Sequence, residues 1–398
     1  MTEPRFLQIH YLASYPGVLL NRDDAGLAKR LPFGPAVRTR VSSQCLKRHW
    51  RMADDARAIR RLAAAAGAAA ERSKEAIERL VTKPLRGHHD DAVVTAVEAE
   101  LIKAVYGAKA LDKKARQALL LGAPEIAHLA ALARDLVAGA PDAKAAAEAA
   151  QEAVKAGKSN LAQLREQNAL APGLESALFG RMVTSDPAAN TDASIHVAHA
   201  FTVHEGQPEQ DYFTVVDDLA GRSEDNEEGG AGAAGVFDSE LTSGLYYGYV
   251  VVDVPLLVSN LTGVKRRDWS APDTDRDLAA RVVENLVHLI ATVSPGAKKG
   301  STAPYSWAES VLLEIGDRQP RTLANAFRDP VPLDGAGSLG ARAAAAMRRE
   351  LEGLDTMFGR GEARLLAARG DLAFDGPERL ALPALAARAA EALRTAAA

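Results

Sequence analysis

Segments in which apolar and polar residues alternate predict the strands of a β-sheet. In residues 5–13 the side chains of Leu7, Ile9 and Tyr11 fall on one side of the chain, which is typical of a half-buried strand. Three further segments have strand character, namely residues 193–204, 245–254 and 309–315. We expect these four segments to form one sheet.

Two segments between the strands have helical spacing, and their order with the strands indicates the fold class. Apolar residues recur on one face from Ser43 to about Ala66 and from Thr274 to about Pro295. The order strand, helix, strand, strand, helix, strand is that of the ferredoxin-like βαββαβ fold, an α+β fold common among RNA-recognition modules. A fold alone does not assign a function.

Two insertions interrupt this core. A long alanine-rich region after the first helix is helical by propensity, and an acidic, glycine-rich excursion separates the second strand from the third. We expect the following division of the chain: core, residues 1–66, 186–204 and 244–330; helical lobe, 67–185; arm, 205–243; helical tail, 331–398.

Composition narrows the class of protein. The chain has 398 residues, of which 47% are hydrophobic, so it can bury a large core. Its single cysteine, Cys45, cannot form an internal disulfide, which fits a reducing compartment. No apolar run reaches the roughly 18 residues of a membrane span. We therefore expect a cytoplasmic globular protein without a membrane segment.

Positive charge is concentrated in residues 22–51, although the chain as a whole is acidic. Eight Lys or Arg residues and two Asp give this stretch a balance of +6, whereas the net charge of the chain is −4. Ser42 or Ser43 can cap the helix that begins here, and cations before a helix N-terminus are unfavourable unless an anion offsets them. A phosphate at the N–H groups of Ser43 and Gln44 would do so. The alternative is a solvated basic face that pairs with acids elsewhere.

Other polar clusters give weaker signals. His196 and His199 fall on opposite faces of their expected strand, so they cannot bind one metal ion from it. Lys298 and Lys299 form a second basic loop that lacks the spacing of a P-loop. Residues 247–249, Tyr-Gly-Tyr, overlap an aromatic submotif of RNA-recognition modules, although core packing explains them at least as well. We predict no catalytic residue, no metal site and no cofactor.

Several short motifs, in a fixed order, resemble those of the CasC family, the backbone subunit of type I-E CRISPR Cascade. The resemblance covers roughly residues 5–330, and its most specific parts are NRDD, SSQ-x-LKR and GRM. The motifs in order are LNRDD, RTRVSSQCLKRHWR, LFGRMVTSD, IHVAHAFTVH, DYFTVVDDL, TSGLYYGYVVVD, SPGAKKGSTAPYS and LANAF.

This resemblance implies a palm with the RNA-recognition fold, a helical fingers lobe and a β-hairpin thumb. It also implies copies that polymerise along the spacer of a CRISPR RNA, together with other Cascade subunits, and present the guide bases for pairing with target DNA. In such a protein Tyr212, Phe213 and Thr214 would form a wedge at a flipped nucleotide. The acidic thumb tip, residues 224–235, departs from the family pattern.

The basic stretch and the resemblance together give one set of candidate RNA-binding residues. In the family the SSQ-x-LKR helix holds the RNA backbone, and the GRM segment lies against a kinked nucleotide. The candidates are Asn21, Arg22, Arg38, Arg40, Ser42, Ser43, Gln44, Lys47, Arg48, Arg51, Arg181, Met182, Lys298 and Lys299.

Two other functions remain open from the sequence. Related proteins with this fold cleave CRISPR RNA, and a nuclease would require a catalytic histidine, for which His10 and His196 are the candidates. A structural protein built around the helical lobe, without any nucleic-acid ligand, is the second.

Overall fold

The computed structural model describes residues 4–216 and 233–396. Within these residues the main element is a ten-stranded sheet of order β12-β11-β10-β1-β9-β7-β3-β2, with β6 and β8 also paired to β9. Its strands are β1 (Phe6–Val18), β2 (Arg30–Phe33), β3 (Ala36–Val41), β6 (Ile195–Val197), β7 (Ala200–Thr202), β8 (Gln207–Val216), β9 (Ala233–Asp253), β10 (Ala308–Gly316), β11 (Ala363–Ala368) and β12 (Glu378–Arg379).

Four neighbouring positions in this sheet have the order and directions of the ferredoxin-like fold. β10, β1, β9 and the pair β6/β7 lie side by side, each antiparallel to its neighbour. Leu7 lies opposite both Ile315 and Val252, so β1 is a central strand. The predicted α+β class is confirmed, although the strand expected over residues 193–204 is divided at Ala198 and His199.

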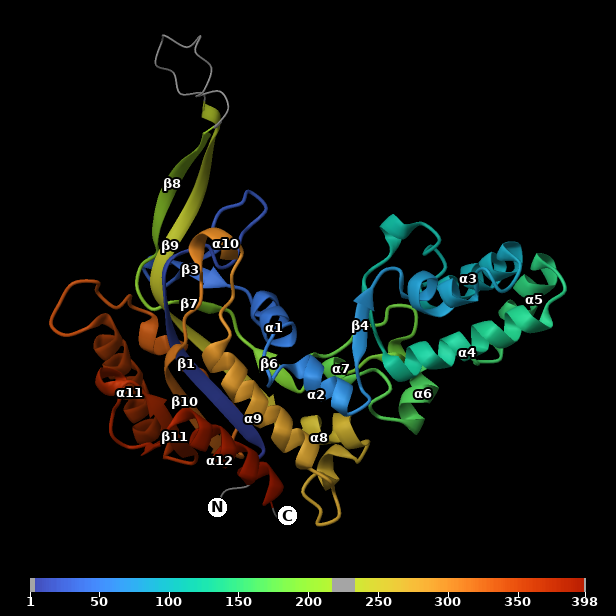
Figure 1. Ribbon diagram of the computed structural model, residues 1–398. Helices are drawn as coiled ribbons and strands as arrows, with labels where there is room; N and C mark the ends of the chain where they lie inside the picture. Colours follow the sequence, from blue (N-terminus) through green and yellow to red (C-terminus); the bar gives the residue numbers. More distant parts are fainter. Residues whose placement is uncertain (1–3, 217–232, 397–398) are drawn as a thin grey trace, which may run out of the picture.

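One face of the sheet is covered by α1 (Ser43–Arg51), α9 (Asp277–Thr292) and α12 (Leu382–Arg394) (Figure 1). We call the sheet and its covering helices the palm. The first helix is shorter than predicted, because Asp55 Oδ1 accepts the N–H of Arg57 at 2.7 Å in a local turn that interrupts it. The chain then resumes as α2 (Ile59–Ala65).

The basic segment before α1 contains regular structure. β2 and β3 form a hairpin whose turn contains Gly34 at φ +62°. A Cβ at this position would lie 1.9 Å from the carbonyl oxygen of Arg328, so only glycine fits. The hairpin is therefore docked against the segment that follows the last palm strand of the predicted fold.

The opposite face of the sheet is covered mainly by the chain between β10 and β11. Leu12, Phe201 and Tyr247 are buried there against Phe327 of the short helix η7 (Ala324–Phe327) and Met347 of α11 (Leu339–Phe358). The tail is not wholly helical as expected, because β11 pairs with β10 and extends the sheet. Both faces of the sheet are thus occupied by protein.

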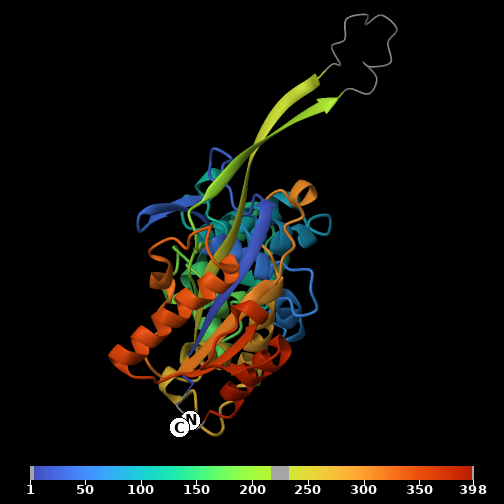
Figure 2. The same ribbon diagram turned by 90° about the vertical axis from the view of Figure 1, so that its left-hand side faces the viewer.

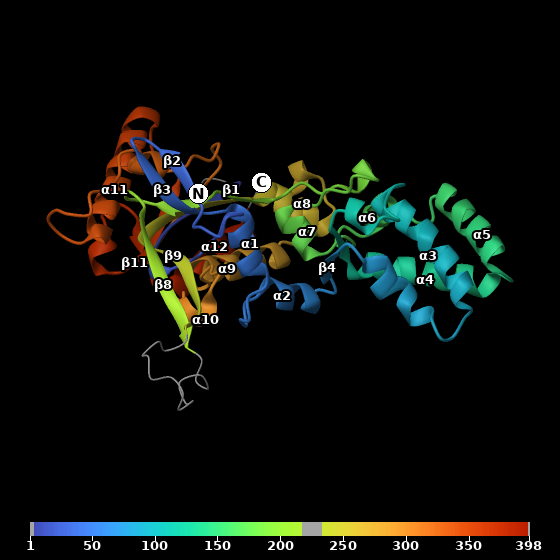
Figure 3. The same cartoon turned by 90° about the horizontal axis from the view of Figure 1, so that it is seen from above.

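The alanine-rich insertion forms a separate helical lobe, which we call the fingers. It has its own apolar cluster, and a small antiparallel sheet joins two of its segments next to α2 (Figure 1). Figure 3 shows α1, α2, α7 and α8 between this lobe and the rest of the palm. Its elements and neighbours are β4 (Ala70–Ser73), η1 (Ile77–Thr82), η2 (Lys83–Leu85), α3 (Asp91–Tyr106), η3 (Lys113–Ala115), β5 (Leu119–Gly122), α4 (Ala123–Gly139), α5 (Ala143–Lys155), α6 (Leu161–Gln167), α7 (Leu174–Phe179), η4 (Pro187–Ala189) and α8 (Val254–Thr262).

The predicted arm is a two-stranded hairpin, which we call the thumb. β9 runs from the palm sheet into the thumb, where it pairs with β8 from Gln207↔Ser243 to Val216↔Ala233. Figure 2 shows this hairpin extending far beyond the palm. Most of the expected acidic tip lies outside the described residues. No helix in the described part of the chain is long and apolar enough to cross a membrane. The remaining short helices are η6 (Arg266–Asp268), α10 (Lys299–Thr302) and η8 (Gly370–Leu372).

Candidate nucleic-acid interface

The start of α1 is held by side chains from two predicted site residues. Ser42 is the N-cap, and its Oγ accepts the N–H of Cys45 at 3.3 Å. The N–H of Ser42 in turn donates to Asn21 Oδ1 at 2.9 Å. Ser42 and Ser43 are buried. The bond between Ser42 and Asn21 fixes the loop at Asn21 against the helix. Asn21 and Ser42 therefore hold the backbone of the site in position.

The outward face of α1 carries the exposed candidates. Leu46 and Trp50 are buried in the palm, whereas Gln44 and Arg48 are exposed and Lys47 is half-buried. Burial, and then the nearby Arg72 guanidinium, lower the pKa of Lys47. One helix thus packs with one face and offers cations and an amide on the other.

A second basic segment lies beside this helix. The N–H of Ala297 donates to the carbonyl of Leu19 at 2.9 Å, and the N–H of Gly296 donates to Nε2 of His49 on α1 at 3.3 Å. These bonds bring Lys298 and Lys299 close to α1, although they are about 250 residues further along the chain than the helix. The two basic segments predicted separately from the sequence are therefore neighbours.

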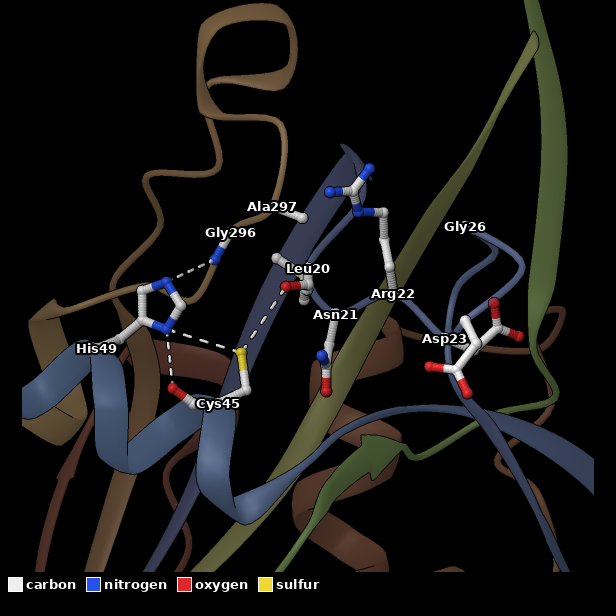
Figure 4. A pocket seen from close by; sticks show the side chains of 10 residues that line it. Leu20, Asn21, Arg22, Asp23, Gly26, Cys45, His49, Gly296 and Ala297 are labelled. Carbon is white, nitrogen blue, oxygen red and sulfur yellow. Dashed lines mark hydrogen bonds between the residues drawn. The ribbon is translucent and has the colours of Figure 1, made fainter. Parts of the chain in front are cut away.

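A hollow of about 500 Å³ lies where these segments meet. Figure 4 shows Cys45 and His49 of α1 on one wall, Gly296 and Ala297 beside them, and the loop with Arg22 across from them. Two carboxylates also line it. Asp23 is occupied by backbone N–H groups of its own turn, and Asp24 is exposed. The complete lining is Leu20, Asn21, Arg22, Asp23, Asp24, Gly26, Cys45, His49, Gly296 and Ala297.

The cations of this surface have no carboxylate partner in the part of the chain that the structure describes. Among the described residues, no carboxylate lies within 4.0 Å of the charged groups of Arg22, Lys47, Arg48, Lys298 or Lys299. This differs from the alternative of a basic face paired with acids. The surface formed by these five residues, which we call the α1 surface, has the charge that a polyanion requires.

The thumb candidates border the same surface. Tyr212 and Phe213 of β8 expose 72% and 43% of their surfaces, and Thr214 is also exposed. The Nζ of Lys298 lies 5.3 Å from the centroid of the Phe213 ring, a cation–π distance. The aromatic wedge and the cationic groups are thus continuous.

Two predicted arginines lie in the interior instead, and the expectation that they offer free cations is corrected. Arg38 is fully buried and donates to the carbonyls of Thr202 at 3.1 Å and Phe327 at 2.9 Å. Arg181 forms a buried ion pair with Glu125 at 2.7 Å. Both guanidinium groups hold the fold, because long-range carbonyl and carboxylate partners surround them.

Two of the remaining candidates, Arg40 and Arg51, already have partners within the protein. Arg40 donates to the carbonyl of Arg30 at 3.1 Å and contacts His199 Nδ1 at 2.9 Å, and Arg51 pairs with Glu175 at 3.3 Å. Met182 exposes 74% of its surface beside the buried Arg181. Its exposed thioether is available for apolar contact with a ligand.

Sequence reasoning missed Arg72 at the base of the fingers. This exposed residue lies on β4. It is close enough to Lys47 and Arg51 for electrostatic repulsion between the charged groups. Burial and then Arg51 lower the pKa of Arg72. Its stretch, AAAERSKEA, resembles an ordinary solvated segment, so no local signal indicated this position.

The aromatic submotif does not form a base-stacking surface. Tyr247 is 1% exposed, and its hydroxyl accepts the N–H of Leu323 at 3.0 Å. The sheet face on which RNA-recognition modules stack bases is covered here by η7 and α11. Core packing is therefore the correct interpretation of residues 247–249.

The chain is similar to a known protein family and to solved structures. The model of the CT1975-like protein family matches residues 7–391. The chain belongs to this family. One solved structure, 26% identical with a TM-score of 0.71, covers 98% of this chain and 100% of its own; it is described as "CRISPR RNA-guided surveillance complex, pre-nicking". Another, 24% identical with a TM-score of 0.65, covers 97% and 99% and is described as "CRISPR RNA-guided surveillance complex". No curated protein matches the chain.

The matches confirm the resemblance to a Cascade subunit that the motifs indicated. They extend beyond the part that the motifs covered, because the family model reaches into the C-terminal region with α11 and β11. The tail that carried no recognisable motif is thus part of the family fold.

The two histidines considered for nuclease chemistry differ in access. His10 is fully buried, with Nδ1 2.9 Å from the hydroxyl of Tyr247 and Nε2 3.2 Å from Glu314, and burial lowers its pKa. It cannot reach an RNA strand. His196 is exposed, and its Nε2 contacts the carbonyl of Ala193 at 3.0 Å. Among the described residues, no group of three His, Cys, Asp or Glu is placed to hold a metal ion.

Proposed function

We propose that this chain is the RNA-binding backbone subunit of a type I-E Cascade surveillance complex. Copies of it would polymerise along the spacer of a CRISPR RNA in the cytoplasm, together with other Cascade subunits. The observation that carries the proposal is the α1 surface, where cations from three chain segments, without carboxylate partners among the described residues, meet beside the exposed thumb aromatics. Membership of a family with structural relatives in CRISPR RNA-guided complexes supports it.

The chemistry of the α1 surface suits the RNA backbone better than the bases. Lys47, Arg48 and Lys299 offer charge to phosphates, which carry no sequence information. Gln44 adds an amide that can bond a phosphate or sugar oxygen. The guide bases would then remain free to pair with a target DNA strand, so pairing would read the sequence. Tyr212 and Phe213 would separate bases where one nucleotide is flipped out.

We further propose that the protein is not an enzyme. The single accessible histidine of the two candidates, His196, is the group to test. If the purified protein cleaves CRISPR repeat RNA at one site and His196→Ala abolishes this cleavage, the protein is a nuclease and the proposal is wrong.

Salt-dependent RNA binding tests the proposal directly. Wild-type protein should carry RNA through purification, with a raised ratio of absorbance at 260 to 280 nm, and should bind guides of any spacer sequence equally. Lys47→Ala combined with Arg48→Ala should weaken binding uniformly and reduce the slope of log affinity against log salt by about 1.4, since each single-stranded phosphate contact contributes about 0.7.

The matched control is Arg349→Ala, an exposed arginine of α11 on the other side of the palm sheet. It should leave the salt slope unchanged. Equal slopes for wild type, the double variant and this control would refute the phosphate contacts.

A further inference from the structure

The loop that carries Lys298 and Lys299 is held in place by atoms far away in sequence. Its base is closed by Ser294 and Ser306, which exchange hydrogen bonds of 2.7 and 2.8 Å. Beyond that base, the N–H of Ala297 donates to the carbonyl of Leu19, just after β1, and the N–H of Gly296 donates to His49. His49 provides the contact between this loop and α1 that Figure 4 shows.

The partners of His49 determine its protonation. Nδ1 lies 2.8 Å from the carbonyl of Cys45, which can only accept, so Nδ1 carries the hydrogen. Nε2 must then accept from Gly296, which requires a neutral ring. Burial, followed by the charge of Lys299, lowers the pKa of His49 and favours that form. The imidazole thus joins a helix carbonyl to a loop amide with both nitrogens used.

The same loop also touches the thumb. Lys298 lies 5.3 Å from the centre of the Phe213 ring, so it covers part of one face of this aromatic side chain. The chain of contacts runs from α1 through His49 to the loop and from the loop through Lys298 to β8. Movement of the loop would therefore displace cations and a wedge residue together.

We infer that His49 is a positioning residue that fixes the lysine loop against α1, so that Lys298, Lys299 and the thumb face one RNA strand. The inference rests on the proposed function. His49 itself supplies no charge and need not touch RNA. Its contribution is to make the two lysines act as part of the α1 surface.

Hydrogen exchange tests the anchoring without RNA. In the full-length protein, His49→Ala should accelerate amide exchange in peptides covering residues 294–303. His49→Gln should not, because its amide oxygen can accept the N–H of Gly296 in place of Nε2. His128→Ala is the matched control, since this histidine of the fingers bonds the carbonyl of Lys158 at 2.7 Å; it should leave the loop unaffected. Unchanged exchange in His49→Ala would overturn the inference.

Binding of a defined CRISPR guide RNA tests the consequence. His49→Ala should reduce the salt slope as much as Lys298→Ala combined with Lys299→Ala, about 1.4 in slope if both lysines contact phosphates. The triple variant should lose no more than the double, and His49→Gln should bind like wild type. Additive losses, a normal slope for His49→Ala, or a failed Gln rescue would each overturn the inference.

The outcomes separate this inference from the proposed function. If wild type binds no guide RNA, the proposed function fails, and the inferred role in RNA binding fails with it. If wild type binds and His49→Ala loosens the loop without changing the salt slope, the inference alone fails. Circular dichroism and thermal unfolding of each variant confirm that differences in binding come from folded protein.

Discussion

The α1 surface and a buried cluster around Glu314 use the same kinds of charged residue in opposite ways. On the α1 surface Arg48, Lys298 and Lys299 are without carboxylate partners in the described chain. In the cluster, which we call the Glu314 network, Glu314 is fully buried and bonds Arg321 at 2.5 Å and Arg364 at 2.8 Å. Arg364 also pairs with Asp355, and His10 completes the set.

The two regions differ in whether water or protein groups surround the charged side chains. A buried charge is stable only when partners satisfy it, and the Glu314 network supplies them from β1, the loop after β10, β11 and α11. These partners hold the pKa of Glu314 well below its usual range despite burial. On the α1 surface the cations remain in water and keep their capacity for a ligand. Charges in the first region stabilise the fold, and those in the second are available for binding.

Substitution in the Glu314 network should have the largest effect on stability. Glu314→Gln leaves Arg321 without a counter-charge and Arg364 with Asp355 alone, and we expect the free energy of unfolding to fall by about 3–5 kcal/mol. Chemical denaturation measures this change. The exposed Glu352→Gln is the control and should change stability by less than about 0.5 kcal/mol. A loss of less than 1 kcal/mol for Glu314→Gln would show that the network stabilises the fold no more than ordinary surface charges do.

Acid should weaken the same network. Because burial lowers the pKa of His10 below 6.5, the folded state binds fewer protons than the unfolded state. The contribution of His10 is fully present above pH 6.5 and is lost as the pH falls, at up to about 1.4 kcal/mol per pH unit. Glu314, whose pKa is also lowered, loses its contribution below pH 4.5. Unfolding free energies measured from pH 8 to 4 should follow this course.

A conservative variant isolates the histidine in that experiment. His10→Gln keeps a polar side chain but cannot be protonated, so its stability should change less between pH 6.5 and 5 than that of the wild type. Identical pH profiles would show that other groups cause the loss.

Substitution on the α1 surface should reverse the pattern. Arg48→Ala should reduce the salt slope of guide RNA binding by about 0.7, because one phosphate contact is lost. Its free energy of unfolding should stay within about 0.5 kcal/mol of the wild type, as for other exposed residues without partners. Binding titrations at several salt concentrations, paired with denaturation curves, measure both quantities. A strong loss of stability would remove the distinction between the two regions.

The smallest effect is expected where a charge is both exposed and paired. Arg348 and Glu352 form an i,i+4 pair on α11 at 3.3 Å, with about half of each side chain exposed. Arg348→Ala should cost about 0.3–0.5 kcal/mol and leave RNA binding unchanged. A cost above 1 kcal/mol would show that exposure is a poor guide to the role of a charge in this protein.

Periodicity predicted the palm because the strands and helices of a buried sheet impose local patterns. It could not distinguish Arg38 from Arg40, because their difference comes from carbonyls at Thr202 and Phe327, far away along the chain. β11 was missed for a similar reason, since its sequence, ARLLAA, lies in an alanine-rich tail that favours helix by propensity.

The candidate site was predicted in part. The cationic helix face was visible from spacing, and the thumb residues came from family motifs. The meeting of the lysine loop with α1 depended on His49 and Leu19, neither of which had a local signal for this contact. The nearness of Arg72 to this helix was equally hidden, because only the tertiary fold brings β4 close to Lys47.

The sheet order has a consequence for how the protein is made. β1 leaves the ribosome before its neighbours β9 and β10, because the residues that pair with it are encoded more than 220 residues later. At about 5–20 residues per second, the strand waits on the order of 10–50 s for its first partner. The fingers, with largely local contacts, are synthesised during that interval. Leu7, Ile9 and Leu12 therefore stay exposed on the nascent chain, and we expect this first strand to be the segment that chaperones shield during translation.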